Sequence, residues 1–330
     1  MGNAITIKQS NIDTVRRALY SCRISTVKDL AQKTDISPAT VGSILNILVE
    51  TGEVQTGDMV SSTGGRPSQS YIFNAEYAYI LALSARTNKD KDVIHASVTN
   101  LLGQVVWEVT HDYKCIHILG FESVIDICLK KYPTIKILAF SLPGVERDGV
   151  IVANDYKELE GLHFANNLKE RYGLPVIIEN DINAAVAGYG RTLGTFPAIV
   201  GIYFPRRYPP GAGLLINGRV FKGTSGYAGE INLMPLNIDW LTVNYCNKKE
   251  IAPAISKLIC AITSVIDPHR IILYGDFFSD ELQKEINMSV SKQVVRNIIP
   301  SIIYRAELEA DITSGLILQA LSLYESEAKA

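Results

Sequence analysis

Apolar residues near the start of the chain recur at helical spacing in two short segments. The apolar positions of the first segment are Ile12, Val15, Leu19 and Cys22. The second segment begins at Thr26, and Asp29 follows three positions later, which is the spacing of a helix capping box. The pattern therefore predicts two short helices, the first of which ends near residues 21–23.

A third segment carries clear signals for a helix over residues 36–50. Ser37 is a favourable N-cap, and Pro38 follows at the first helical position, where its missing N–H costs nothing. The apolar positions form one face and are Val41, Ile44, Leu45, Leu48 and Val49. On or beside the opposite face lie the small or neutral polar residues Ala39, Thr40, Ser43 and Asn46.

Small hydrogen-bonding residues on an exposed helix face are typical of close approach to DNA. A solvent-facing helix normally carries Lys and Glu there, whereas Ser, Thr and Asn can bond to base edges in the major groove. The candidate DNA contacts on this helix are Ser37, Ala39, Thr40, Ser43 and Asn46. The alternative is a three-helix scaffold whose surface binds nothing.

The next stretch favours the DNA-binding interpretation. Residues 53–56 and 69–73 have the pattern of two strands of a hairpin, and the loop between them contains Gly64-Gly65-Arg66-Pro67. Such a tip can enter a minor groove, where Arg66 would follow the negative potential. Together with the preceding helices, the hairpin predicts a winged helix-turn-helix domain over residues 1–75.

The remaining residues, 76–330, alternate strand and helix patterns, which predicts an α/β architecture of two lobes around a cleft. Buried strands are expected at 79–83, 135–141, 175–179, 199–204, 270–274 and 301–304, and half-buried strands at 104–109 and 214–221. Helices are expected near 122–131, 164–172, 183–193, 251–266, 279–295 and 312–326.

Composition and charge narrow the class of protein. The chain of 330 residues is 47% hydrophobic and 20% charged, as globular domains are, and it has five scattered cysteines without a C-x-x-C pair. With no signal segment, a cytoplasmic protein without a membrane partner is expected. Residues 1–72 carry seven Lys and Arg against six Asp and Glu. DNA binding would therefore depend on a few placed groups, doubled in a homodimer.

Five collinear motifs carry a resemblance to a known family. They are Ser141-Leu142-Pro143-Gly144, Glu179-Asn180-Asp181-Ile182-Asn183-Ala184-Ala185, Gly211-Ala212-Gly213, Asn217-Gly218 and Gly226-Tyr227-Ala228-Gly229-Glu230. In this order they resemble the ROK family of bacterial sugar kinases and sugar-responsive repressors, and the Gly-Arg-Pro wing resembles its repressor branch, which includes xylose and N-acetylglucosamine regulators. The resemblance implies a two-lobed, actin-like ATPase (ribonuclease H-like) fold and a homo-oligomer.

Three segments depart from the kinase members of that family. Kinases of this type have Asp-x-Gly-Gly-Thr after the first strand, but residues 84–88 are Ser-Ala-Arg-Thr-Asn, without the acid or the glycines that admit a phosphate. Residues 204–210 and 274–278 are bulky where small residues are expected. The sequence therefore predicts a non-enzymatic protein that uses no nucleotide cofactor.

The resemblance also assigns a sugar site. Asp181 corresponds to the kinase base, Asn180 and Glu230 to sugar contacts, and Gly144 to a position of close backbone approach. Leu233 replaces the family's sugar- and zinc-binding His, and only Cys246 remains of its cysteine cluster, so no metal site is expected. Without the resemblance, Asp181 is equally explained as the N-cap of a helix.

Three hypotheses on function follow from these expectations. The first is a transcriptional regulator, most simply a repressor of carbohydrate genes, that binds a double-stranded operator and responds to a sugar or related metabolite between the lobes. The second is a DNA-binding regulator whose second domain binds no ligand and serves oligomerisation. The third is a divergent sugar kinase.

Overall fold

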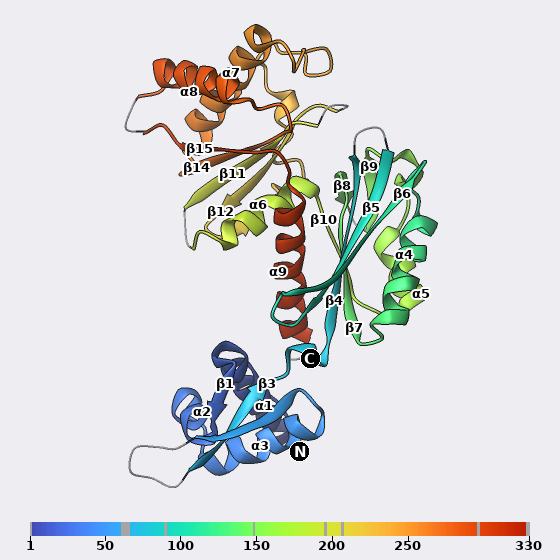
Figure 1. The fold of residues 1–330 in the computed structure, drawn as a ribbon, viewed down its shortest axis with the longest axis vertical. Coiled ribbons are helices and arrows are strands. Elements are labelled where there is room, and N and C mark those ends of the chain that lie inside the picture. The colour runs from blue at the N-terminus through green and yellow to red at the C-terminus, as the bar shows by residue number, and fades with distance from the viewer. Residues whose placement is uncertain are drawn as a thin grey trace.

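The computed structural model describes residues 2–60, 67–88, 91–147, 149–194, 197–205, 208–295 and 298–327. Its strands form two five-stranded sheets, a three-stranded sheet and a two-stranded ribbon. Figure 1 shows the three-stranded sheet and its helices at one end of the molecule, apart from the two lobes that the larger sheets form. The last helix runs between the lobes towards that end.

The N-terminal part has the three helices and the hairpin that the sequence predicts, and one further strand, β1, that it does not. Its helices and strands are α1 (Gly2–Cys22), β1 (Ile24–Thr26), α2 (Val27–Thr34), α3 (Pro38–Glu50), β2 (Val54–Val60) and β3 (Ser68–Phe73). The apolar faces of the three helices meet in one core. Its buried residues include Val15, Leu19, Leu30, Val41, Ile44, Leu45 and Leu48. Cys22 was expected in that core but is exposed, because the helix ends at this residue.

Local hydrogen bonds set the beginnings of these helices. The Thr26 hydroxyl oxygen accepts from the backbone N–H of Asp29 at 3.3 Å, and the hydroxyl donates to the Asp29 carboxylate at 2.7 Å. Asp35, at φ 57°, ends α2 in the left-handed region and turns the chain towards α3. Ser37 then caps α3 by accepting from the N–H of Thr40 at 3.2 Å. Residues 26–37 thus form α2 and the tight turn that leads to α3.

The first lobe is built on a mixed sheet of order β10-β7-β4-β5-β6. Its strands are β4 (Tyr79–Asn88), β5 (Lys91–Asn100), β6 (Val105–Tyr113), β7 (Ile135–Ser141) and β10 (Val176–Glu179). Helices α4 (Ile118–Lys131) and α5 (Phe164–Tyr172) cover one face, and the ribbon β8 (Gly144–Arg147) and β9 (Val150–Asn154) extends from it. The sequence analysis missed β5, because polar residues such as Ser97 and Thr99 interrupt its pattern although both are fully buried.

The second lobe has a sheet of order β13-β12-β11-β14-β15. Its elements are β11 (Ala198–Tyr203), β12 (Gly211–Ile216), β13 (Arg219–Val220), α7 (Lys248–Ile266), β14 (Arg270–Tyr274), α8 (Asp280–Gln293) and β15 (Ser301–Arg305). The single strand expected over 214–221 was wrong, because Asn217 and Gly218 have φ of 50° and 75° and form a two-residue turn between β12 and β13. Helix α7 begins earlier than expected because Asn247 caps it.

Two helices pack against each other between the sheets, namely α6 (Asp181–Arg191) and α9 (Glu309–Glu327). Their backbones are in contact at two glycines. A Cβ placed on Gly188 would lie 1.9 Å from the carbonyl oxygen of Asp311, and one on Gly315 would lie 2.0 Å from that of Ala184. No side chain fits at either position, so the two helices form a tight unit. None of the described helices is long and apolar enough to cross a membrane.

Candidate functional site

The outer face of α3 presents the residues that the sequence analysis singled out for DNA. Ser37, Ala39, Ser43 and Asn46 are exposed, and Thr40 is half-buried. The Ser43 hydroxyl donates to the carbonyl of Ala39 at 3.0 Å, which leaves its lone pairs free to accept. In the part of the chain that the structure describes, the Asn46 amide makes no hydrogen bond. The exposed positions from residue 39 to residue 46 therefore carry small, neutral groups, and Glu50, four residues after Asn46, adds a carboxylate at the end of the helix.

Two of these residues also have a structural task. The hydroxyl oxygens of Ser37 and Thr40 lie 2.8 Å apart, and Ser37 caps the helix through the Thr40 N–H. A substitution at either position would therefore disturb the start of α3 as well as any contact with DNA. Ser43 and Asn46 do not cap the helix. Substitutions at these two positions therefore test contact with DNA without disturbing the start of α3.

The expected wing is present as the antiparallel pair β2 and β3. Its tip, residues 61–66, lies outside the described residues, and so does the candidate DNA contact Arg66. The role of Arg66 therefore stays a prediction from the sequence.

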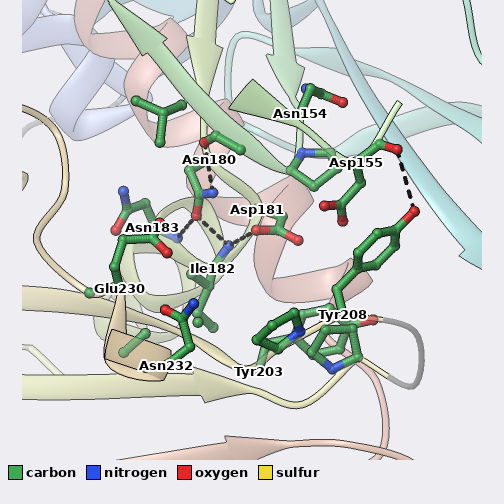
Figure 2. Close-up of a pocket in the computed structure, with 18 of the residues that line it drawn as sticks. Asn154, Asp155, Asn180, Asp181, Ile182, Asn183, Tyr203, Tyr208, Glu230 and Asn232 are labelled. Atoms are coloured by element: carbon green, nitrogen blue, oxygen red, sulfur yellow. Dashed lines mark hydrogen bonds between the residues drawn. The ribbon is translucent and has the colours of Figure 1, made fainter. Parts of the chain in front are cut away.

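A cavity of about 440 Å³ lies between the lobes. Figure 2 shows polar side chains from both lobes around it. The structure brings all four predicted ligand residues to this cavity: Gly144, Asn180, Asp181 and Glu230. The sequence analysis missed other lining residues, of which the polar ones include Asn154, Asp155, Asn183, Tyr203, Tyr208 and Asn232.

Asn180, rather than Asp181, caps helix α6. The side-chain oxygen of Asn180 accepts from the N–H groups of Ile182 and Asn183 at 3.1 and 3.3 Å, and its amide donates to the carbonyl of Gly144 at 3.1 Å. Asp181 is the first helical residue, and one of its carboxylate oxygens accepts from Ile182 N–H at 2.7 Å. The N-cap explanation of Asp181 was therefore wrong, and its carboxylate lines the cavity (Figure 2).

Glu230 reaches the cavity because a glycine precedes it. Gly229 has φ of 104°, and a Cβ there would lie 1.9 Å from the carbonyl oxygen of Ala212. The Gly229 carbonyl in turn accepts from Ala212 N–H at 2.8 Å, which ties this segment to the start of β12. Only glycine permits such a close approach of two backbones, so the Gly-Glu pair has a geometric basis.

Three carboxylates of the cavity have raised pKa values. Burial, followed by repulsion from Asp181, raises the pKa of Asp155 to about 7, although Lys157 opposes the shift. Burial raises the pKa of Asp181 to about 6, with Glu230 adding to the shift, and burial also raises the pKa of Glu230. The cavity thus holds acidic groups that are costly to ionise together.

The segment that departs from the kinase phosphate loop forms an ion pair within the chain. Arg86 Nε lies 3.0 Å from a carboxylate oxygen of Glu309, and the Ser84 hydroxyl donates to the same carboxylate at 2.6 Å. Both residues lie on β4, whereas Glu309 is the first residue of α9. A side-chain pair therefore lies where the kinases of the family have a glycine-lined turn.

Aromatic rings gather in the other departing segments. The rings of Phe277 and Phe278 are 4.3 Å apart, and Tyr245 lies 4.8 Å from the first and Tyr304 5.2 Å from the second. Phe204, which is 2% exposed, packs on both phenylalanines. These rings fill the region next to residues 274–278 with hydrophobic side chains.

Comparison with known proteins agrees with this geometry. Residues 120–249 match the model of the ROK family. The xylose repressor of Caldicellulosiruptor bescii is 24% identical over 255 residues, which are 72% of this chain and 61% of the repressor. The regulator NagC of Escherichia coli is 25% identical over 241 residues, or 70% of this chain and 58% of NagC. The match spans about three-fifths of these relatives.

Solved structures resemble the two lobes and the part before them in fold. A ROK family transcriptional regulator described as a homologue of the E. coli MLC protein has a TM-score of 0.65 at 17% identity and covers 98% of both chains. A protein of Listeria monocytogenes described as a putative N-acetylmannosamine kinase has a TM-score of 0.64 at 15% identity, covering 74% of this chain and 99% of its own. The expected two-lobed, actin-like ATPase fold is confirmed.

Proposed function

We propose that the chain is a transcriptional regulator, most simply a repressor of carbohydrate genes, whose residues 1–75 bind an operator and whose residues 76–330 sense a sugar or sugar derivative. The observation that carries this proposal is the pairing of exposed, small neutral groups at residues 39–46 of α3 with a polar cavity between the lobes. Relatives named as repressors support it. Two copies in a homodimer would present two α3 helices to one operator.

The lining of the cavity suits a compound with many hydroxyl groups. Asp155, Asp181 and Glu230 supply carboxylates, and Asn183 and Asn232 supply amide oxygens that have no hydrogen-bond partner. Carboxylates and amides bind vicinal hydroxyls through charge-assisted hydrogen bonds. The cavity volume of about 440 Å³ lies within the range of small-molecule sites.

The packed helices α6 and α9 and a small shared pocket link this cavity to the N-terminal part. Helix α6 carries the cavity residues Asp181 and Asn183 and is packed backbone to backbone on α9. Near the other end of α9, Tyr324 lines a small pocket together with Arg16 of α1. Arg16 pairs with Glu53 at 2.6 Å, and burial, with Glu53 contributing, raises the pKa of Tyr324 to about 12. A ligand-induced shift of α6 would thus reach the DNA-binding helices.

Tyr324→Ala is expected to break this connection. Coupling between two sites typically changes affinity by about 5- to 150-fold, and we expect the variant to reduce the effect of the ligand on operator affinity to less than about twofold. Operator binding without ligand should persist. The measurement is fluorescence anisotropy of a labelled operator with and without ligand. Leu318→Ala, at an exposed position of the same helix, is the control. If Tyr324→Ala keeps the full effect of the ligand on operator affinity, coupling through α9 and α1 is excluded.

Arg66→Ala tests the wing separately. We expect weaker operator binding and less discrimination in favour of A·T-rich flanks, because an arginine in a narrow minor groove responds to its potential. Binding assays on operators with A·T-rich and G·C-rich flanks measure both effects. Unchanged affinity on both would remove the wing from the DNA interface.

Phosphoryl transfer is the less favoured activity. Binding of ATP would require the Arg86–Glu309 pair and the rings around Phe277 to be displaced. We therefore expect no transfer of labelled phosphate from ATP to any hexose. Transfer at a rate above the buffer control would support the kinase hypothesis instead.

The test of the proposed function is genome-wide capture of bound DNA, followed by binding assays on the enriched sites. We expect a small set of palindromic sites next to genes of carbohydrate metabolism, and release or tightening when a sugar is added. Absence of any enriched site, together with no binding of the purified protein to duplex DNA, would refute the DNA-binding function. Specific DNA binding that no sugar alters would support the hypothesis of a domain without a ligand.

A further inference from the structure

The acidic groups of the interlobe cavity come from three separate segments. Asp155 follows β9, Asp181 begins α6, and Glu230 follows the Gly226–Gly229 stretch. Figure 2 shows the Asp155 and Asp181 side chains facing each other, with Glu230 on another wall. In the described part of the chain, no hydrogen bond reaches the carboxylate of Asp155 or Glu230. Within the described residues, these two carboxylates therefore lack a hydrogen-bond donor.

The described lining residues contribute little positive charge. Lys157 is the cation among them, and its ammonium lies 2.8 Å from the carboxylate of Glu160, which also lines the cavity. Lys157 is therefore already matched by a negative charge. Tyr203 and Tyr208 also line the cavity, and a tyrosine side chain carries no positive charge.

Two amide oxygens provide an observation independent of the carboxylates. Asn183 is 8% exposed and lines the cavity, and its side-chain oxygen has no hydrogen-bond partner among the described residues. The same is true, within that part of the chain, of the side-chain oxygen of Asn232, another lining residue. A buried acceptor without a donor destabilises the folded state. Figure 2 shows Asn183 next to Glu230 on the cavity wall, where a ligand could supply the donor.

We propose that the ligand of this cavity is an amino sugar whose ammonium group lies between Asp155 and Asp181. This inference rests on the proposed sugar-sensing function and adds the charge of the ligand. An ammonium group has three donors and no acceptor, and it therefore complements a wall of acceptors. Its charge removes the repulsion between the two carboxylates, whereas a phosphate ester would add to that repulsion.

A bound metal ion is a less suitable source of positive charge. Among the described residues, no group of three or more His, Cys, Asp and Glu side chains is arranged to hold a metal ion. The carboxylates instead line separate walls of a cavity of about 440 Å³, which leaves room for a sugar ring between them. The spread of the acidic groups thus favours an organic cation.

Calorimetry of the whole protein at pH 7 tests the charge of the ligand. The probes are glucosamine, galactosamine and mannosamine, each compared with its hydroxyl and N-acetyl counterparts, and glucosamine 6-phosphate. This pH lies below the pKa of about 8 typical of an amine next to an electron-withdrawing group, so the amino sugars are charged. We expect at least one amino sugar to bind about tenfold or more tightly than both neutral counterparts, and the phosphate ester to bind more weakly.

Asp155→Asn tests the position of the charge. The variant should lose most of the preference for the amino sugar over its neutral counterparts, because it removes one of the two carboxylates but keeps the shape of the side chain, and the preference that remains is due to Asp181. Glu158→Gln is the matched control, since Glu158 is an exposed carboxylate close in the chain that does not line the cavity. The control should keep the full preference for the amine.

Thermal melting without ligand shows whether the variant is folded and gives a second measurement. The folded state binds a proton at Asp155 more tightly than the unfolded state, because its pKa is raised to about 7. Stability contributed by this group is therefore lost as pH rises from about 4 to 7. Asp155→Asn should lack this loss and melt at or above the temperature of the natural protein at pH 8.

Each outcome decides the inference. Equal affinities for amines and neutral sugars in the natural protein would overturn it and leave the sugar-sensing function intact. An unchanged amine preference in Asp155→Asn would also overturn it. If magnesium or calcium binds to the natural protein but not to Asp155→Asn, the ligand of these carboxylates is a metal ion, and the amino-sugar inference is overturned. If no sugar or amino sugar binds, both this inference and the sensing function fail.

Discussion

Glutamate in place of Ser43 is expected to weaken operator binding by about a hundredfold. Ser43 is exposed on α3, and its hydroxyl bonds to the Ala39 carbonyl within the helix. A carboxylate at this position would lie against DNA phosphates and lose a base contact worth about 1–3 kcal/mol. The measurement is fluorescence anisotropy with a labelled operator at constant salt concentration.

The control for this substitution places the same charge on another helix. Ser291 is also exposed, and its hydroxyl donates to a carbonyl of its own helix, that of Met288, at 2.9 Å. Ser291→Glu should bind the operator as the natural protein does. If Ser43→Glu and Ser291→Glu behave alike, α3 does not contact DNA. Ser43→Ala separates the loss of a base contact from repulsion by the DNA phosphates, because it removes the hydroxyl without adding a charge. It should weaken the operator complex and leave binding to random duplexes unchanged.

Gly315→Ala is expected to lower the melting temperature of the two-lobed part of the protein by roughly 10 °C. The added Cβ would lie 2.0 Å from the Ala184 carbonyl oxygen, and a backbone atom cannot move aside as a flexible side chain can. Overpacking of this kind costs about 1–3 kcal/mol or more, and each kcal/mol corresponds to about 2–4 °C in a domain of this size. Calorimetric melting curves measure the shift.

Gly42→Ala is the control for the glycine-to-alanine change itself. Gly42 lies in the middle of α3, and a Cβ added there would meet no atom within 4 Å, so alanine should stabilise the helix by up to about 1 kcal/mol. An unchanged melting temperature in Gly315→Ala would mean that the backbones of α6 and α9 are not in contact at this glycine. Gly188→Ala, on the facing helix, should behave like Gly315→Ala.

Much of the N-terminal part was predictable because its signals are local. The Ser37-Pro38 start and the apolar face of α3 lie within one helix, and both appear as expected. The two-residue turn at Asn217-Gly218 was equally local and was missed, because the strands on either side were taken together as one half-buried run. Strand β5 was missed because its buried polar residues interrupt the alternation of apolar and polar positions that marks a strand.

The candidate cavity was predictable only in part. Gly144, Asn180, Asp181 and Glu230 were expected from the motifs, and all four line it. Asp155 was missed because Asn154-Asp155 after a short strand resembles an ordinary turn. Tyr208 was missed because the Pro-rich stretch around it carries no periodic pattern, although its hydroxyl donates to the Asp155 carbonyl at 3.3 Å.

The amino-acid sequence alone determined the helices of the N-terminal part, the two-lobed α/β architecture and the loss of a glycine-lined phosphate turn, because periodicity, caps and glycine positions act within a few residues. The tertiary structure decided which groups meet. Ser84 and Glu309 bond across 225 positions, and the pKa values of Asp155 and Asp181 depend on burial and on neighbouring carboxylates. Distances through space set these energies, and no local pattern encodes them.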